Sequence, residues 1–123
     1  MQEWWHDAEA VQDAGALIAV VSGKWVMAVL RALTAGPMRH NELQRAVDSG
    51  IRPQALGDTL RRLEAAGLVR RHVHPGTPPA VAYELSRAGQ SLSAPLAALS
   101  CWVGEHRAEL EALPGWPTDR PAA

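Results

Sequence analysis

Apolar residues recur along much of the chain at the spacing of one helix face. Ala10, Ala14, Leu17 and Val21 follow one another at intervals of three and four residues, which predicts a helix over residues 8–21. The same periodicity predicts further helices over residues 25–36, over residues 40–47, and from Pro53 to a stop at Gly67. Gly-Pro at 36–37 and the turn residues at 48–50 separate these segments.

The helix that begins at Pro53 carries the clearest local signals. Proline fits the first helical position, because its missing N–H is not needed there. Leu56, Leu60 and Leu63 form one apolar face, and Gly67 is placed to close the helix in the left-handed conformation. This helix should therefore pack one face inward and leave the opposite face open.

Beyond Gly67 the pattern changes to an alternation of period two. Residues 68–74 and 81–86 each predict a strand, and the Pro- and Gly-rich stretch 75–80 between them predicts a loop. The two strands should pair as a β-hairpin.

A longer apolar pattern occupies the C-terminal part. Leu92, Leu96, Leu99, Val103, His106, Leu110 and Leu113 follow alternating spacings of four and three, which is typical of a packing seam over three heptads. Ser86 should cap this helix, and Pro95 should bend it. Residues 114–123 should form a flexible tail.

The order of these elements predicts a winged helix-turn-helix within a mainly α chain that has a small β-ribbon (α+β). We expect one domain over 1–123: an N-terminal helix at 8–21, a winged helix-turn-helix core at 25–86, a C-terminal dimerisation helix at 87–113 and the tail at 114–123. In such a fold the second helix of the motif can enter the major groove of DNA.

The formal net charge of −1 hides a basic central segment. Residues 39–75 hold seven arginines against four acidic residues. With the leucine face turned inward, Gln54, Asp58, Arg61 and Arg62 point outward, where Gln suits adenine and Arg suits guanine or phosphate. The alternative is an ordinary solvated face, with Glu64 paired to a nearby arginine.

Composition and motifs argue against several other classes. No apolar run approaches the ~20 residues of a membrane span, and no leader is apparent, so we expect a cytoplasmic protein that does not bind membranes. The sequence has no Gly-rich phosphate loop and no nucleophile–base pair, which predicts no catalytic residues and no cofactor. His72 and His74 share a strand face, but without further ligands nearby we expect no metal site.

Five stretches resemble the HxlR-type family of winged helix-turn-helix transcriptional regulators: 23-GKW-25, 36-GPMRHNEL-43, 50-GIRPQALGDTLRRLEAAGLVRR-71, 78-PPAVAYELSRAG-89 and 99-LSCW-102. The resemblance implies a homodimer that binds palindromic operators, with dimer contacts from the first and last helices. Arg52 and Gly57 stand where the family usually has a small polar cap and Thr or Ser. Gln12 lies near the position of a cysteine that some members use as a redox sensor.

These observations give a set of candidate site residues. Candidate DNA contacts are Arg39, His40, Arg52, Gln54, Asp58, Arg61, Arg62, Arg71 and Thr77, the last at the tip of the wing. Candidate dimer contacts are Leu92, Leu96, Leu99, Trp102, Val103 and His106, and a candidate ligand pocket comprises Trp5, Trp102 and His106. We expect Arg70 or Arg71 to pair with Glu64 or Glu84.

Several alternatives stay open at this point. Trp4 and Trp5 could cover a dimer partner or close a ligand cavity, and His106 could sense pH or a ligand or end the tight packing. For Cys101 we expect a half-buried structural thiol. The expected partners are double-stranded DNA, a second copy of the chain and a small-molecule effector. The competing function is a winged-helix protein-interaction module that does not read DNA.

Overall fold

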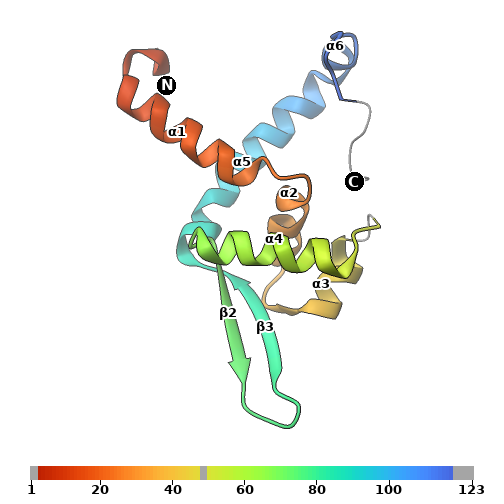
Figure 1. Ribbon diagram of the computed structural model, residues 1–123. Helices are drawn as coiled ribbons and strands as arrows, with labels where there is room; N and C mark the ends of the chain where they lie inside the picture. The colour runs from red at the N-terminus through yellow and green to blue at the C-terminus, as the bar shows by residue number, and fades with distance from the viewer. Residues whose placement is uncertain (1–2, 48–49, 118–123) are drawn as a thin grey trace.

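A three-helix body carries a β-ribbon at one end and two projecting helices at the other (Figure 1). The computed structural model describes residues 3–47 and 50–117, so most of the predicted turn at 48–50 and residues 118–123 of the predicted tail lie outside the described residues. The helices are η1 (Trp4–His6), α1 (Ala8–Val21), α2 (Val26–Leu33), α3 (His40–Val47), α4 (Pro53–Ala65), α5 (Arg87–Glu105) and α6 (Arg107–Glu111). The strands are β1 (Met38–Arg39), β2 (Val69–His74) and β3 (Ala80–Leu85).

The hydrophobic core lies between α2, α3, α4 and the base of the ribbon. Its buried members are Val26, Val29, Leu30, Leu33, Leu43, Val47, Ile51, Leu56, Leu60, Leu63, Leu68, Val69 and Leu85. The inward face predicted for α4 is confirmed, since Leu56, Leu60 and Leu63 are each at most 1% exposed. Trp25 is half-buried against this core.

The C-terminus of α4 is closed by Gly67, as predicted. Gly67 has a φ of +80°, a conformation that costs glycine little. Its N–H donates to the carbonyl of Glu64, and the N–H of Leu68 donates to the carbonyl of Leu63. This is the Schellman arrangement, which satisfies the last carbonyls and turns the chain directly into β2.

The sheet has one strand that the sequence pattern did not predict. Its antiparallel order is β1-β3-β2, with Met38 opposite Tyr83 and Val69 opposite Leu85. β1 ties the start of α3 to the ribbon. The outer part of the ribbon extends beyond the core, and Val73 is 50% exposed.

A close junction joins α5 to the end of α4. Ser86 caps α5 as predicted: its Oγ accepts the N–H of Gly89 and donates to the carbonyl of Gly67. Gly89 is buried, and a β-carbon on it would lie 2.2 Å from the carbonyl oxygen of Leu68. The base of α5 is therefore fixed against the winged-helix body.

The predicted seam over three heptads is wrong in one respect. α5 ends at Glu105, and His106 adopts φ −113° and ψ 18° before the short α6 begins. Leu92 and Leu96 pack against the chain's own core, whereas Leu99 is 53% exposed. The apolar row thus has two parts: Leu92 and Leu96 pack within the chain, and the side chains from Leu99 onward are not covered by the core.

α1 has an apolar side with little to pack against. None of its residues is buried, and Ile18 is 61% exposed. α1 and α5 both project from the body on the side opposite the ribbon, and they diverge from one another (Figure 1). Among the described residues, no single helix has the length and apolar character to cross a membrane; α1 and α2 together have them, but the pair is bent by 87°.

Candidate DNA-binding interface

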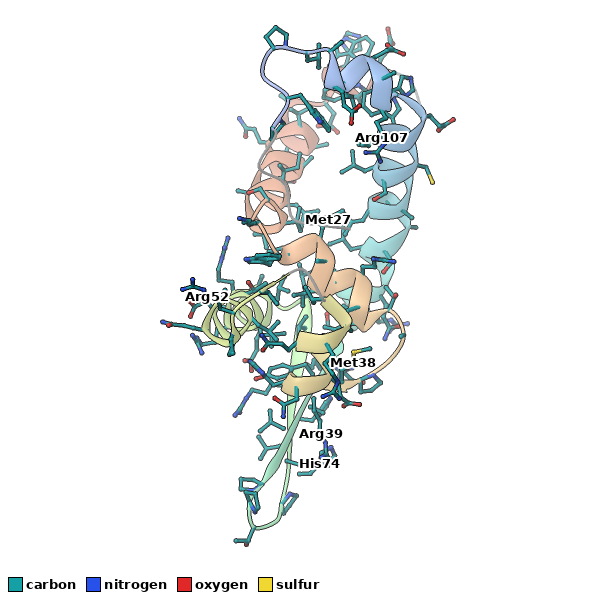
Figure 2. The ribbon with its side chains drawn as sticks, turned by 90° about the vertical axis from the view of Figure 1, so that its right-hand side faces the viewer. Met27, Met38, Arg39, Arg52, His74 and Arg107 are labelled. Carbon is teal, nitrogen blue, oxygen red and sulfur yellow. The ribbon has the colours of Figure 1, made fainter. Side chains whose placement is uncertain are left out.

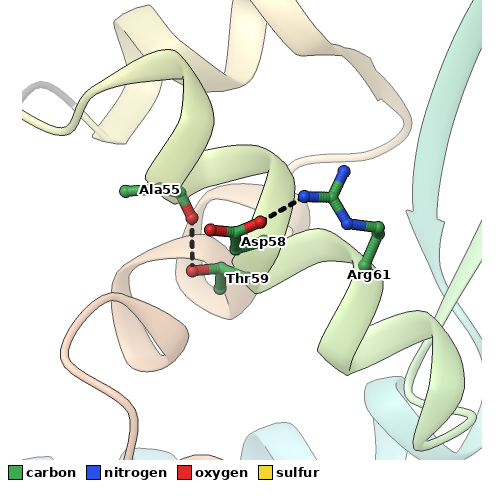
Figure 3. A network of polar contacts seen from close by, with 4 residues as sticks. All are labelled: Ala55, Asp58, Thr59 and Arg61. Carbon is green, nitrogen blue, oxygen red and sulfur yellow. Dashed lines mark hydrogen bonds and ion pairs between the residues drawn. The ribbon is translucent and has the colours of Figure 1, made fainter.

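The outward face of α4 is uncovered by the described chain. Arg52, Gln54, Asp58 and Arg61 are all exposed on it, opposite the buried leucines. The predicted outward orientation is therefore confirmed. The alternative pairing through Glu64 is not seen among the described residues: the ion pair on this face joins Arg61 to Asp58 (Figure 3).

Arg52 lies at the position that caps the N-terminus of α4. Its backbone is extended, with φ −77° and ψ 150°, and its side chain makes no capping hydrogen bond. Figure 2 shows the side chain pointing away from the body at the end of α4. Because no ion pair holds Arg52 within residues 3–47 and 50–117, its guanidinium is available to an external anion.

Arg62 differs from its neighbours on the same helix. Its guanidinium lies against Gly23, in the turn between α1 and α2: Nη1 is 2.9 Å from the place a β-carbon of residue 23 would take. Arg62 is nevertheless exposed. The Arg62 side chain therefore lies over the protein's own backbone. An arginine that simply contacted phosphate would instead extend freely into solvent.

The start of α3 brings further basic groups to the surface. Glu42 accepts the backbone N–H of Arg39 at 2.9 Å, which fixes the beginning of the helix. Arg39, Asn41, Glu42 and Arg45 line an open hollow of about 360 Å³. Arg45 was not among the predicted site residues, although the i, i+4 spacing from Asn41 indicates that the two share a helix face. His40 is half-buried beside them.

The ribbon supplies the remaining predicted contacts. Arg71 and Thr77 are exposed, Thr77 in the loop between β2 and β3. Figure 2 shows Arg39 beside the ribbon, with His74 farther along it toward the loop.

The predicted pairing of Glu84 with Arg70 or Arg71 is wrong. Instead His72 Nε2 lies 2.5 Å from Glu84 Oε1. Neither Arg70 nor Arg71 forms an ion pair with a described carboxylate. The two arginines are thus free for an external anion. No group of three His, Cys, Asp or Glu side chains that could hold a metal is found among the described residues.

The predicted ligand pocket is not assembled within one chain. Trp102 stacks on His106 with ring centroids 4.4 Å apart, and His106 Nδ1 lies 2.8 Å from the carbonyl of Trp102. Trp5 instead contacts the rings of Trp4 and His6. Cys101 is exposed and not half-buried, because it lies on a turn of α5 beyond the reach of the core.

Comparison with known proteins agrees with this geometry. A family model described as HxlR-like helix-turn-helix matches residues 20–111. YtcD of Bacillus subtilis strain 168, an uncharacterized HTH-type transcriptional regulator, is 41% identical over 91 residues, covering 74% of this chain and 71% of its own. Its similarity to this chain therefore extends over most of both proteins.

Solved structures share the fold. A regulator assigned to the MarR family from Enterococcus faecalis V583 is similar with a TM-score of 0.71 and 36% identity, over 82% of this chain and 90% of its own. The redox regulator HypR in its reduced form is similar with a TM-score of 0.75 and 31% identity, over 82% of this chain and 99% of the HypR chain. The chain belongs to the HxlR-like helix-turn-helix family, a family of DNA-binding transcriptional regulators.

Proposed function

We propose that the protein binds palindromic sites in double-stranded DNA as a homodimer and so represses or activates transcription. The observation that carries this proposal is the outward face of α4, where Gln54 and Arg61 are exposed and no described segment covers them. A helix with one buried apolar face and one open polar face can enter the major groove while it stays anchored to its own core.

The side chains divide by the part of DNA that each can reach. Gln54 and Arg61 contact base edges, and Asp58 lies beside them as the ion-pair partner of Arg61. Phosphate contacts come from basic groups around this helix: Arg39, His40, Arg45, Arg52 and Arg71. Arg62 would join them only on leaving its contact with Gly23. Thr77 lies at the tip of the wing, which follows the DNA backbone or the adjacent minor groove. Phosphate contacts position a protein on the duplex, whereas base contacts select the sequence.

Dimerisation uses the projecting helices. Leu17 and Ile18 on α1 and Leu99 and Trp102 on α5 are all large apolar side chains with 38–61% of their surface exposed. A second copy that covers them removes this surface from water, which is the usual driving force of association. We assign residues 8–21 and 87–113 to the dimer and residues 25–86 to DNA binding. Val103 and His106 belong to the dimer surface, while Leu92 and Leu96 support it from the core.

Ligand response is a further part of the proposal. The Trp102–His106 pair lies at the end of α5, beyond Leu99, where a partner subunit would close over it. Apolar pockets between helices are frequent ligand sites. A panel of aromatic and apolar metabolites that binds there should raise the melting temperature of the dimer, and a Trp102→Ala variant should lose that rise.

The test is selection of binding sites from a pool of randomised DNA duplexes. The proposal predicts an inverted repeat whose half-sites are about 10 base pairs apart or a multiple of that spacing. Binding should weaken steeply with salt, with a slope that rises by about 0.9 for each phosphate contacted. A selection that yields no preferred sequence would contradict the proposal and would favour a winged helix that binds an acidic protein. We also propose that the protein acts in the cytoplasm.

A further inference from the structure

Arg61 and Asp58 form an ion pair on the outward face of α4. Arg61 Nη2 donates to Asp58 Oδ1, one helical turn away (Figure 3). Both side chains face solvent, with 70% and 58% of their surface exposed. An exposed pair of this kind adds little to folding stability. Its direct consequence is the position that it gives to the arginine.

The guanidinium lies beside Gly57, at a distance where a β-carbon would make ordinary van der Waals contact. A β-carbon on residue 57 would be 3.5 Å from Arg61 Nη1 and 3.9 Å from Nη2. The arginine thus bends back along α4 toward its N-terminus and lies beside a helix turn that has no side chain of its own. Long helical side chains favour this direction. Asp58 therefore holds the guanidinium beside this turn by charge.

We propose that Asp58 determines sequence specificity by positioning Arg61 and not by contacting a base itself. This inference rests on the proposed function. An arginine that is already held loses less conformational freedom when it donates two hydrogen bonds to guanine. The carboxylate also offsets the charge of Arg61, so the pair gains little from the phosphates that every DNA sequence presents.

The experiment compares two DNA probes at one salt concentration: a duplex selected by the wild-type protein from a randomised pool, and a duplex of random sequence with the same length. The ratio of the two affinities measures discrimination. The variants are Asp58→Asn, Arg61→Ala and the double variant. Glu64→Gln is the matched control, because it removes the same charge from the same helix and Glu64 has no ion pair among the described residues.

We expect Asp58→Asn to raise affinity for the random duplex and to lower discrimination roughly three- to tenfold, in the range of coupling between contacting residues. Glu64→Gln should leave discrimination unchanged. In the Arg61→Ala background, Asp58→Asn should have no further effect on discrimination. The melting temperature of Asp58→Asn should stay close to that of the wild type.

Two results would overturn the inference. If Asp58→Asn lowers discrimination equally with and without Arg61, Asp58 contacts a base directly. If Asp58→Asn leaves discrimination unchanged while Arg61→Ala lowers it, the ion pair has no part in selection. Failure of the proposed function looks different, because the wild-type protein then selects no sequence from the pool.

Discussion

The guanidinium of Arg62 lies over the backbone of Gly23, with Nη1 2.9 Å from the position that a β-carbon on residue 23 would occupy. Gly23 lies in the turn that joins α1 to α2, while Arg62 is in the last turn of α4. One side chain thus connects the projecting helix to the helix that faces DNA. A substitution at Gly23 should therefore alter the position of the Arg62 side chain on α4, and a substitution at Arg62 should alter the packing of the turn at Gly23.

Gly23→Ala should release Arg62 from this contact. The new β-carbon would also lie 3.0 Å from Val26 Cγ2, so the turn must adjust slightly. Because the end of an arginine can swing away, we expect stability to fall by less than about 1.5 kcal/mol, a typical cost of tight packing. The freed charge should strengthen binding to random-sequence DNA. Urea unfolding and fluorescence anisotropy measure the two effects.

Gly15→Ala is the control for that variant. A β-carbon at Gly15 meets nothing within 4 Å, and alanine favours helix over glycine by about 0.5–1 kcal/mol. It should therefore stabilise α1 and leave DNA affinity unchanged. If Gly23→Ala also leaves DNA affinity unchanged, Arg62 does not act through its contact with Gly23.

Gly89→Ala should destabilise the fold. Its β-carbon would lie 2.2 Å from the carbonyl oxygen of Leu68, which also accepts the N–H of Ser86. Backbone cannot swing away as a side chain can, so α5 must shift, at a cost of about 1–3 kcal/mol or more. Urea unfolding measures this loss. Gly104→Ala on the same helix meets nothing within 4 Å, and an equal loss there would contradict the explanation.

Leu99→Glu should dissociate the dimer without unfolding the subunit. Leu99 is 53% exposed in the single chain, so its replacement opens no cavity in the core. A buried charge across an interface is costly because it loses its hydration. Sedimentation equilibrium should show a monomer, and affinity for a selected DNA site should fall. Ser91→Glu near the base of α5 is the control and should remain dimeric; a dimeric Leu99→Glu variant would mean that α5 makes no subunit contact.

Local signals in the sequence predicted much of the fold. Pro53, Gly67 and Ser86 act within one helix turn of their own position, so the ends of α4 and the start of α5 follow from them. The inward face of α4 also follows from its leucines. The resulting outward face was predicted correctly because burial of one face of a helix fixes the direction of the other.

The remaining features depend on contacts between distant parts of the chain. β1 is two residues long, too short for a period-two pattern, and exists through pairing with Tyr83 and Ala82 on β3. The four-three spacing continues through His106 although the backbone breaks there, since spacing does not record backbone conformation. No local pattern could show that Arg62 lies on Gly23. Such contacts come from tertiary packing.

The most direct test of the account is the affinity of Gln54→Ala for a selected DNA duplex and for a random-sequence duplex at the same salt concentration. Gln54 is exposed on the outward face of α4, and glutamine that donates to and accepts from adenine contributes about 1–3 kcal/mol of discrimination. The account predicts a loss of that size on the selected duplex and little change on the random one. Equal losses on both, or no loss on either, would contradict the claim that this face reads the bases of DNA.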